Sequence, residues 1–273
     1  MDLGLEGRVA VVGGASKGIG RATVLRLAEE GVRVAYCGRS LDSLREVEKE
    51  VSTFGGTCLP VECDLGQRSG ADSFVKEAVD AFGGVDIMVF TPSIHLSREF
   101  MDLTDDEWEE TFNITFHAGA RLARAVLPHM QAQRWGRIVF VGAGSIYKQT
   151  VGIGIDHTDV HPDFTTAKAA LTNLGKFLSK SFGPDQIFVN TLHPGFVLSA
   201  ERRAAWAEPG SDASKGPQDA FIEMASSYGY IPALGRPGTP EGFANVIAFL
   251  CSEANEYMTG IDAAIDGGGL DVG

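Results

Sequence analysis

Short apolar runs alternate with segments of helical apolar spacing along almost the whole chain. Consecutive apolar and β-branched residues that end in glycine or a polar turn predict buried strands, whereas apolar residues three or four apart predict amphipathic helices. Strands are predicted over 9–12, 32–37, 58–63, 85–90, 136–143, 187–192 and 259–268. Helices are predicted from 21 onward and over 41–54, 69–82, 104–130, 162–182 and 235–250. This alternation predicts an α/β fold, a doubly wound parallel sheet of about seven strands with helices on both faces.

The length of 273 residues suits one large domain that spans 1–273, and 44% hydrophobic with 22% charged residues is an ordinary composition. The net charge of -13 argues against nucleic acid bound through a general basic surface, although a phosphorylated cofactor needs only a local cationic pocket. The N-terminus lacks a basic start and a long apolar core, and no stretch approaches the roughly 18 apolar residues of a membrane span. We therefore expect a cytoplasmic protein without membrane contact.

The four cysteines show no C-x-x-C spacing, and three of them stand in or beside predicted strands. They are Cys37, Cys58, Cys63 and Cys251. We interpret them as buried free thiols rather than a metal or redox site, and no metal site is predicted.

A glycine-rich turn follows the first predicted strand and precedes the first predicted helix. Its glycines are Gly14, Gly18 and Gly20. Such a turn directs backbone N–H groups and a helix N-terminus to one point, where a phosphate binds; Gly14 suits a positive φ, and Gly18 and Gly20 permit close approach. Glycines also mark any tight βα turn, but here the strand and the helix supply the context of a dinucleotide fingerprint in a Rossmann-type fold. The Gly14-x-x-x-Gly18-x-Gly20 spacing resembles that of the short-chain dehydrogenase/reductase (SDR) family, with Gly13 where that family usually has threonine.

The end of the second predicted strand indicates which dinucleotide binds. An acid there favours NAD, whereas a nearby arginine favours the 2′-phosphate of NADP. The chain has Gly38-Arg39-Ser40, and Lys17 in the glycine turn can reach the same ribose. Two cations without a carboxylate predict NADP(H) rather than NAD(H); the alternative is that Arg39 is a solvated charge at a strand end.

The resemblance to the SDR family continues to the C-terminus, with departures. It implies that Asp64 and Leu65 meet the adenine and that the Pro194-Gly195 turn, with Val197 and Ser199, clamps the nicotinamide and contacts the pyrophosphate. Where the family usually has Asn-Asn-Ala-Gly, the chain has Phe90-Thr91-Pro92-Ser93, whose hydroxyl groups are the possible substitutes. We expect cofactor contacts from Gly14, Ser16, Lys17, Gly18, Ile19, Gly20, Arg39, Asp64, Leu65, Thr91, Lys168, Pro194, Gly195, Val197 and Ser199.

The catalytic residues are where the chain departs most from the family. The segment Ala167 to Leu171 matches the helix that contains Tyr-x-x-x-Lys, which makes Lys168 the implied cofactor-ribose ligand. Asn113 matches the helix asparagine that maintains a water-linked proton path to this lysine; alternatively, its amide bonds a neighbouring backbone group. Phe164 replaces the tyrosine and Ala143 the serine. Neither side chain can donate a proton or bind a developing alkoxide.

Three replacements are conceivable. Ser145 lies two residues past Ala143 and points the same way if the strand continues. His161 is seven residues before Lys168, a spacing at which some enoyl-reductase relatives in the family place their tyrosine, although His161 can also cap a helix that begins at Pro162. Tyr147 or His157 on the connecting loop can also reach in. A water molecule is a further source of the proton.

We therefore expect an NADP(H)-dependent oxidoreductase that acts on a carbonyl or alcohol, similar to divergent beta-ketoacyl carrier-protein reductases. The alternatives are a cofactor-binding protein without redox turnover, as a sensor or partner subunit, and an enoyl reductase, lyase or isomerase. Residues 200–232 are punctuated by glycine and proline and predict a substrate lid. By resemblance, helices 108–130 and 164–182 pair in a homo-oligomer, as a tetramer or dimer. A bulky, apolar substrate pocket is expected from Phe90, Pro92, His95, Tyr147, Phe164 and Trp206.

Overall fold

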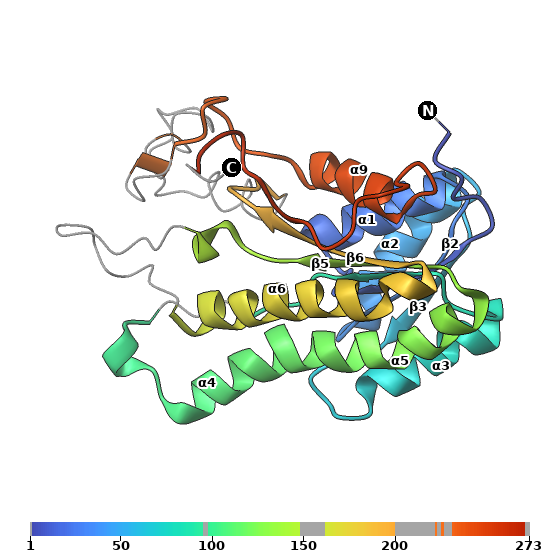
Figure 1. Ribbon diagram of the computed structural model, residues 1–273, viewed down its shortest axis with the longest axis horizontal. Helices are drawn as coiled ribbons and strands as arrows, with labels where there is room; N and C mark the ends of the chain where they lie inside the picture. The colour runs from blue at the N-terminus through green and yellow to red at the C-terminus, as the bar shows by residue number, and fades with distance from the viewer. Residues whose placement is uncertain are drawn as a thin grey trace.

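Seven apolar runs of the chain form one parallel sheet, and the amphipathic segments between them cover both of its faces (Figure 1). The computed structural model describes residues 2–94, 98–147, 162–199, 222, 225–226 and 231–270. The strands are β1 Val9–Gly13, β2 Arg33–Gly38, β3 Cys58–Glu62, β4 Ile87–Phe90, β5 Gly136–Val141, β6 Ile187–Pro194 and β7 Asp262–Ile265. The helices are α1 Gly18–Glu29, α2 Leu41–Thr53, α3 Gly70–Phe82, α4 Asp105–Phe112, α5 Ala118–Gln133, α6 Pro162–Phe182 and α9 Pro240–Cys251. Shorter turns are η1 Phe100–Asp102, η2 Asn113–His117, η3 Gly144–Ile146 and η5 Gly183–Asp185.

The strand order is β3-β2-β1-β4-β5-β6-β7, and every pairing is parallel. This confirms the predicted α/β class and doubly wound sheet. The order reverses beside β1, which pairs with β2 on one side and with β4 on the other. A crevice forms at the carboxyl ends of strands where the order reverses, so the fold itself positions a binding site there.

Two hydrophobic cores hold the helices on the sheet. In Figure 1, α1, α2 and α9 lie on one face, and α3, α5 and α6 lie on the other. Because side chains alternate along a strand, Ala10 and Val12 pack into the first core while Val11 packs into the second. All five residues of β1 are buried, as expected for a strand covered on both faces.

The long helix predicted over 104–130 is interrupted. Its start is confirmed: Thr104 Oγ1 accepts the Glu107 N–H at 3.3 Å, and Glu107 Oε2 accepts the Thr104 N–H at 2.9 Å, which is a capping box. After α4, residues Asn113–His117 form a π-helical turn before α5 begins. Such turns are often found at functional sites, and here Ile114 lines the pocket described below.

The last helix begins later than the predicted residue 235. Gly235 has a φ of +61°, a left-handed conformation that does not continue into a helix. The side chain of Thr239 instead accepts the Gly242 N–H at 3.1 Å and caps α9 at Pro240.

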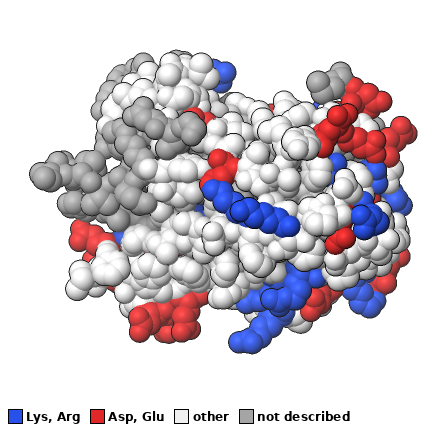
Figure 2. Space-filling model, in the orientation of Figure 1, with Lys and Arg blue, Asp and Glu red and all other residues white. Residues whose placement is uncertain are grey.

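Charge is unevenly distributed over the surface. Figure 2 shows acidic side chains gathered over α4, whose first turn holds Asp105, Asp106 and Glu107, and basic side chains over α5. No helix within the described part of the chain has the length and apolar character needed to cross a membrane. The predicted lid at 200–232 lies almost entirely outside the described residues.

Candidate functional site

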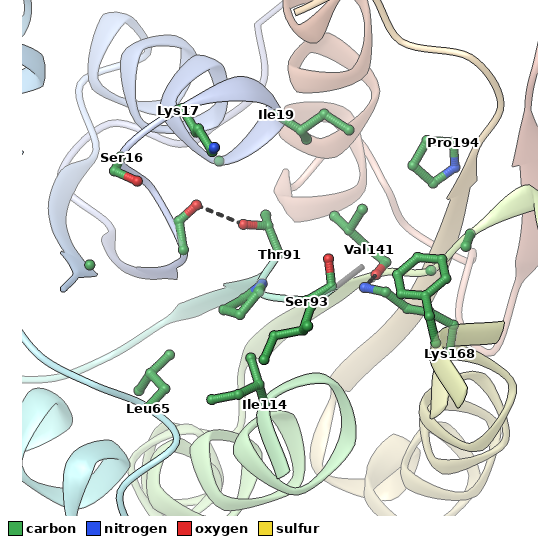
Figure 3. A pocket seen from close by; sticks show the side chains of 18 of the residues that line it. Ser16, Lys17, Ile19, Leu65, Thr91, Ser93, Ile114, Val141, Lys168 and Pro194 are labelled. Atoms are coloured by element: carbon green, nitrogen blue, oxygen red, sulfur yellow. Dashed lines mark hydrogen bonds between the residues drawn. The ribbon is translucent and has the colours of Figure 1, made fainter. Parts of the chain in front are cut away.

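A pocket of about 590 Å³ opens at the carboxyl ends of the strands. Its walls come from the loops after β1 to β4, the ends of β5 and β6, and one side of α6. Figure 3 shows Ser16 and Lys17 on one side and Lys168 and Pro194 on the other. We call the part around Lys17 and Arg39 the Arg39 end, and the part formed by 141–145, Phe164, Lys168 and 194–196 the Lys168 end.

Most of the predicted site residues meet in this pocket. Its lining includes Gly14, Ser16, Lys17, Ile19, Gly20, Arg39, Asp64, Leu65, Thr91, Ser145, Lys168, Pro194 and Gly195. Gly18, Asn113, Val197 and Ser199 are described but do not line it. His161 and His157 lie outside the described residues.

The glycine turn has the positive φ predicted for Gly14, and Gly18 has one as well. Gly14 and Gly18 have φ values of +77° and +57°, which favour glycine. A Cβ on Gly20 would lie 2.3 Å from the Gly14 carbonyl oxygen, so a side chain there would force the turn apart. A Cβ on Gly18 would meet no protein atom within 4 Å, so this glycine serves the backbone conformation rather than protein packing.

Helix α1 begins in this turn with its N-terminus uncapped. The N-cap residue is Lys17, which has extended backbone and makes no side-chain capping bond. The first N–H groups of a helix have no partner within the helix, and together with the helix dipole they attract an anion. Since Lys17, Ile19 and Gly20 line the pocket, this helix end opens on it.

Thr91 fastens the end of β4 to the glycine turn. Its hydroxyl hydrogen is shared between the carbonyl oxygens of Gly13 and Gly14, each 2.9 Å from Oγ1. Figure 3 shows one of these bonds. A Cβ on Gly14 would come within 2.7 Å of this hydroxyl oxygen. Thr91 therefore steadies the central strand, while Pro92 and Ser93 beside it line the pocket.

The Arg39 end carries two exposed cations. Lys17 and Arg39 both line it, and the two residues directly after β2, Arg39 and Ser40, include no acid. Asp64 also lines this end, but its Oδ1 accepts the Gly66 N–H at 2.9 Å and so shapes the turn after β3. Cys37 and Cys63 line the same wall; all four cysteines are free, and Cys37 and Cys251 are buried whereas Cys58 and Cys63 are half-buried.

Lys168 is the charged group of the opposite end. Its side chain projects from α6 and is 2% exposed, and its Nζ donates to the Val141 carbonyl oxygen at 2.6 Å (Figure 3). Nζ lies 5.8 Å from the centroid of the Phe164 ring, which stands one helical turn earlier. Burial lowers the pKa of Lys168 from its ordinary 10.5 to about 7, because the charged form loses its hydration.

Ser145 supplies a hydroxyl at the Lys168 end of the pocket. It lies in η3, lines the pocket, and its Oγ is 3.1 Å from Thr165 Oγ1 on α6. Ala143 and Phe164 also line the pocket and bring only hydrocarbon to it. Ser145 therefore lines the pocket, but β5 ends at Val141 and residues 144–146 form η3, so the strand does not continue to Ser145 as its prediction required. Its role as the replacement for the family's serine stays a prediction.

A group of side chains around the buried His193, behind the Lys168 end, was not predicted. On β6, His193 Nδ1 accepts the Ala143 N–H at 3.1 Å, and its Nε2 lies 2.7 Å from Asp262 Oδ1 at the start of β7. Burial lowers the pKa of His193 below its ordinary value, and the Asp262 charge opposes this only in part. Nδ1 also lies 3.1 Å from the Ala143 carbonyl oxygen, so either tautomer of the neutral ring bonds the Ala143 backbone.

Tyr147 belongs to this group around His193 rather than to the pocket. Its hydroxyl donates to the Asp262 carboxylate, and its ring packs edge-on against His193 with centroids 5.1 Å apart. Lys176 Nζ lies 2.5 Å from Asp262 Oδ2. Burial raises the pKa of Asp262, but the bonds from Lys176 and Tyr147 outweigh it and lower the pKa overall. Asp262 therefore anchors residues 143–147, which carry Ser145, from both ends.

Asn113 does not line the pocket. Its Nδ2 donates to the Gly66 carbonyl oxygen at 2.9 Å, and Arg121 donates to its Oδ1 at 2.5 Å. The side chain therefore bonds a neighbouring backbone group, the alternative that the sequence left open. The predicted proton path from this residue to Lys168 remains a prediction.

The residues expected to make the pocket apolar divide into three groups. Pro92 and Phe164 line the pocket, whereas Phe90 is fully buried in the core, where it packs on Phe140. His95 and Trp206 lie outside the described residues. Further apolar lining residues that the sequence did not single out are Ile94, Ile114, Phe196 and Leu270. Within the described ranges, no cluster of three His, Cys, Asp or Glu side chains is placed to hold a metal.

Comparison with known proteins agrees with this geometry. A family profile described as Enoyl-(Acyl carrier protein) reductase matches residues 14–269. The chain is 30% identical over 269 residues to 3-oxoacyl-[acyl-carrier-protein] reductase FabG of Aquifex aeolicus, covering 98% of this chain and 99% of the relative. It is 29% identical over 268 residues to human dehydrogenase/reductase SDR family member 4, covering 97% and 88%.

Among solved structures, L-sorbose reductase from Gluconobacter frateurii, complexed with NADPH and L-sorbose, superposes with a TM-score of 0.87 at 29% identity over 100% of both chains. A 3-oxoacyl (acyl-carrier-protein) reductase from Agrobacterium tumefaciens C58 with NADP bound gives a TM-score of 0.84 at 28% identity over 98% and 96%. The pocket, the sheet and these relatives lead to one conclusion: the chain belongs to the short-chain dehydrogenase/reductase family of oxidoreductases.

Proposed function

We propose that the protein is an NADP(H)-dependent oxidoreductase that transfers hydride between the nicotinamide and a carbonyl or alcohol substrate, with a proton donor other than tyrosine. One observation carries the proposal. A single pocket joins a dicationic end, with Lys17 and Arg39, to an end with a buried lysine, and the uncapped N-terminus of α1 opens on it.

The residues present fit a phosphorylated dinucleotide. Lys17 and Arg39 suit a 2′-phosphate, and the free N–H groups of α1 suit a pyrophosphate. Asp64 and Leu65 lie where the adenine is expected, and Pro194 and Gly195 lie beside Lys168 at the nicotinamide end. Bound NADPH would supply the hydride. The two solved relatives named above, with NADPH and NADP, support this choice over NAD(H).

The protein's own residues would bind and orient the substrate. Phe164 and Phe196 offer apolar surface, and the Ser145 hydroxyl is placed to bond a substrate oxygen. The candidate proton donors that the sequence indicates are Ser145, His161 and a water molecule. Tyr147 is not favoured because its hydroxyl bonds Asp262.

A second candidate function follows from Phe164 and Ala143. Without a hydroxyl at either position, the chain is also compatible with a protein that binds NADP(H) without redox turnover, as a sensor or partner subunit. A lyase, isomerase or enoyl reductase is the third possibility, because these reactions do not demand that tyrosine.

Steady-state oxidation of NADPH and of NADH, tested on a panel of ketones, enones and quinones, separates these functions. Turnover of ketones that prefers NADPH supports the proposal. Turnover of enones alone identifies an enoyl reductase. Tight NADPH binding without consumption on any substrate favours the non-redox functions.

We further propose that the protein is a homo-oligomer, a tetramer or a dimer, formed through α4–α5 and α6. The aromatic side chain of Phe177 on α6 is 65% exposed, which is apolar area that a second copy would cover. Light scattering at micromolar concentration tests this, and a monomer would refute it.

A further inference from the structure

Among the described residues that line the Lys168 end, Lys168 has the one side chain that carries a charge. We propose that the Lys168 ammonium donates the proton to the carbonyl oxygen of the substrate, in the place of the absent tyrosine. This inference rests on the proposed function and names its acid. In the Tyr-x-x-x-Lys pattern the lysine holds the cofactor ribose. Proton donation to the substrate is therefore a different role for the lysine at this position.

The geometry leaves Lys168 free to donate. An ammonium group has three N–H bonds, and within the described chain only the Val141 carbonyl oxygen accepts one of them, at 2.6 Å. Lys168 forms no ion pair with a described carboxylate. Two N–H bonds therefore remain for groups bound in the pocket, while the bond to Val141 fixes the position of Nζ.

Phe164 defines the surroundings of this ammonium. The ring centroid lies 5.8 Å from Nζ, and with Ala143 it gives the wall of the pocket an apolar surface. No hydroxyl from position 164 or 143 competes for the substrate oxygen. The same apolar wall withholds water from Lys168, and so favours loss of its proton to a developing alkoxide.

The other described candidates are less suited to supply a net proton. The Ser145 hydroxyl can bond the substrate oxygen, but an alcohol is far too weak an acid to remain deprotonated at neutral pH. His193 does not line the pocket, and its two ring nitrogens face Ala143 and Asp262. Tyr147 bonds Asp262.

The lowered pKa of Lys168 is consistent with proton donation to the substrate. Burial brings its pKa to about 7, in the range where a general acid is most effective at neutral pH. The titratable groups on the elements packed around α6 include His193 on β6, whose pKa the Lys168 charge also lowers. The others are His117 of η2, the acids of α4, Arg121, Arg124 and His129 of α5, Arg137 of β5 and Asp185 of η5. On α6 itself, Asp163 is buried and accepts a hydrogen bond from Thr111 at 2.6 Å.

The step balances without a further reactant. As hydride reaches the carbonyl carbon, one N–H bond of Lys168 breaks and an O–H bond forms on the substrate oxygen. The amine is left neutral, in the form that burial favours, and regains its proton from water before the next turnover. In the oxidative direction the neutral amine accepts the alcohol proton.

Chemical rescue is the test. Lys168→Ala should lower kcat about 100-fold or more, and methylamine or ethylamine, small enough for the vacated space, should restore it about tenfold in proportion to the protonated amine. Lys180→Ala, which removes an exposed lysine of the same helix, is the matched control and should behave as wild type with or without amine. Rescue by protonated amine distinguishes a donor from a residue that only holds the cofactor.

A second readout does not depend on turnover. Brief acetylation of the cofactor-free protein across pH 5.5 to 10 (roughly the span between ordinary His and Lys pKa values), with mass-spectrometric quantification, should show Lys168 reacting with a midpoint near pH 7. The exposed lysines in the same digest serve as the reference. If the midpoint of Lys168 acetylation falls at the same high pH as that of the exposed lysines, the proposal is overturned.

The outcomes separate the two claims. If wild type reduces carbonyls but Lys168→Ala is not rescued, or if His161→Gln alone abolishes the acid limb of the pH profile, Lys168 is not the donor and the proposed function stands. If none of the tested substrates leads wild type to oxidise NADPH, the proposed function fails and this inference fails with it.

Discussion

Replacing Lys168 by methionine should raise the free energy of unfolding above that of wild type at pH 6. The gain over wild type should be smaller at pH 9. In the folded protein Lys168 is 2% exposed with a pKa of about 7, against an ordinary 10.5 in the unfolded chain. Between these values the unfolded chain binds the additional proton, so the free energy of unfolding of wild type rises with pH. The stability that wild type gains from this pKa difference is complete above the pKa of the lysine in the unfolded chain. It is lost as the pH falls through the pKa of Lys168 in the folded protein.

The magnitude follows from that difference. Lowering a lysine pKa from 10.5 to about 7 corresponds to about 5 kcal/mol in total, of which about 2.5 kcal/mol falls between pH 6 and pH 9. Methionine removes this dependence. It also removes the bond to the Val141 carbonyl oxygen, which costs about 1 kcal/mol at every pH.

Urea denaturation of both proteins at the two pH values measures the effect. The difference in the free energy of unfolding, variant minus wild type, should decrease by about 2.5 kcal/mol from pH 6 to pH 9. The control is Lys180→Met, which replaces an exposed lysine on the same helix. It should change the free energy of unfolding by the same amount at pH 6 and at pH 9. If the difference between Lys168→Met and wild type is also the same at pH 6 and pH 9, the claim that Lys168 has a lowered pKa in the folded protein is refuted.

Three further changes test other parts of the site. Arg39→Ala should weaken NADPH binding about tenfold, about 1.5 kcal/mol for one exposed charge-assisted bond, and leave NADH binding unchanged in fluorescence titrations; equal weakening of both would contradict a 2′-phosphate contact. Asp262→Ala removes the partner of Tyr147 and His193 and should lower the free energy of unfolding by about 2 kcal/mol at pH 7, a deficit that shrinks as acid protonates the wild-type carboxylate, whose pKa is lowered. Gly142→Ala places a Cβ 2.3 Å from His193 Nδ1 and should cost about 1–3 kcal/mol, measured as a lowered Tm; an unchanged Tm would mean that His193 can move aside.

Local patterns predicted the fold and one wall of the pocket. Glycine-terminated apolar runs define β1 and the turn after it, and the positive φ of Gly14 was foreseeable from that turn alone. Lys17 and Arg39 were foreseeable because parallel strands place their carboxyl ends at one edge of the sheet. Such inferences need only residues that are close in sequence or equivalent in successive βα units.

Contacts between distant segments could not be predicted in the same way. Tyr147, His193 and Asp262 come from three separate segments, and a tyrosine in a loop gave no sign that it would bond an aspartate on the last strand. The π turn at Asn113–His117 likewise has no apolar signature that distinguishes it from the helix on either side. His193 was visible in the sequence, directly before the Pro194-Gly195 turn, and that position was the available signal.

The measurement that tests the central claim most directly is isotope transfer from NADPH that carries deuterium at the nicotinamide C4, with mass spectrometry of the product from each active carbonyl. We predict one deuterium on the new carbinol carbon and no transfer from equally labelled NADH at the same concentration. A protein that binds NADPH tightly but leaves its deuterium in place with every substrate would contradict the assignment of an NADP(H)-dependent oxidoreductase.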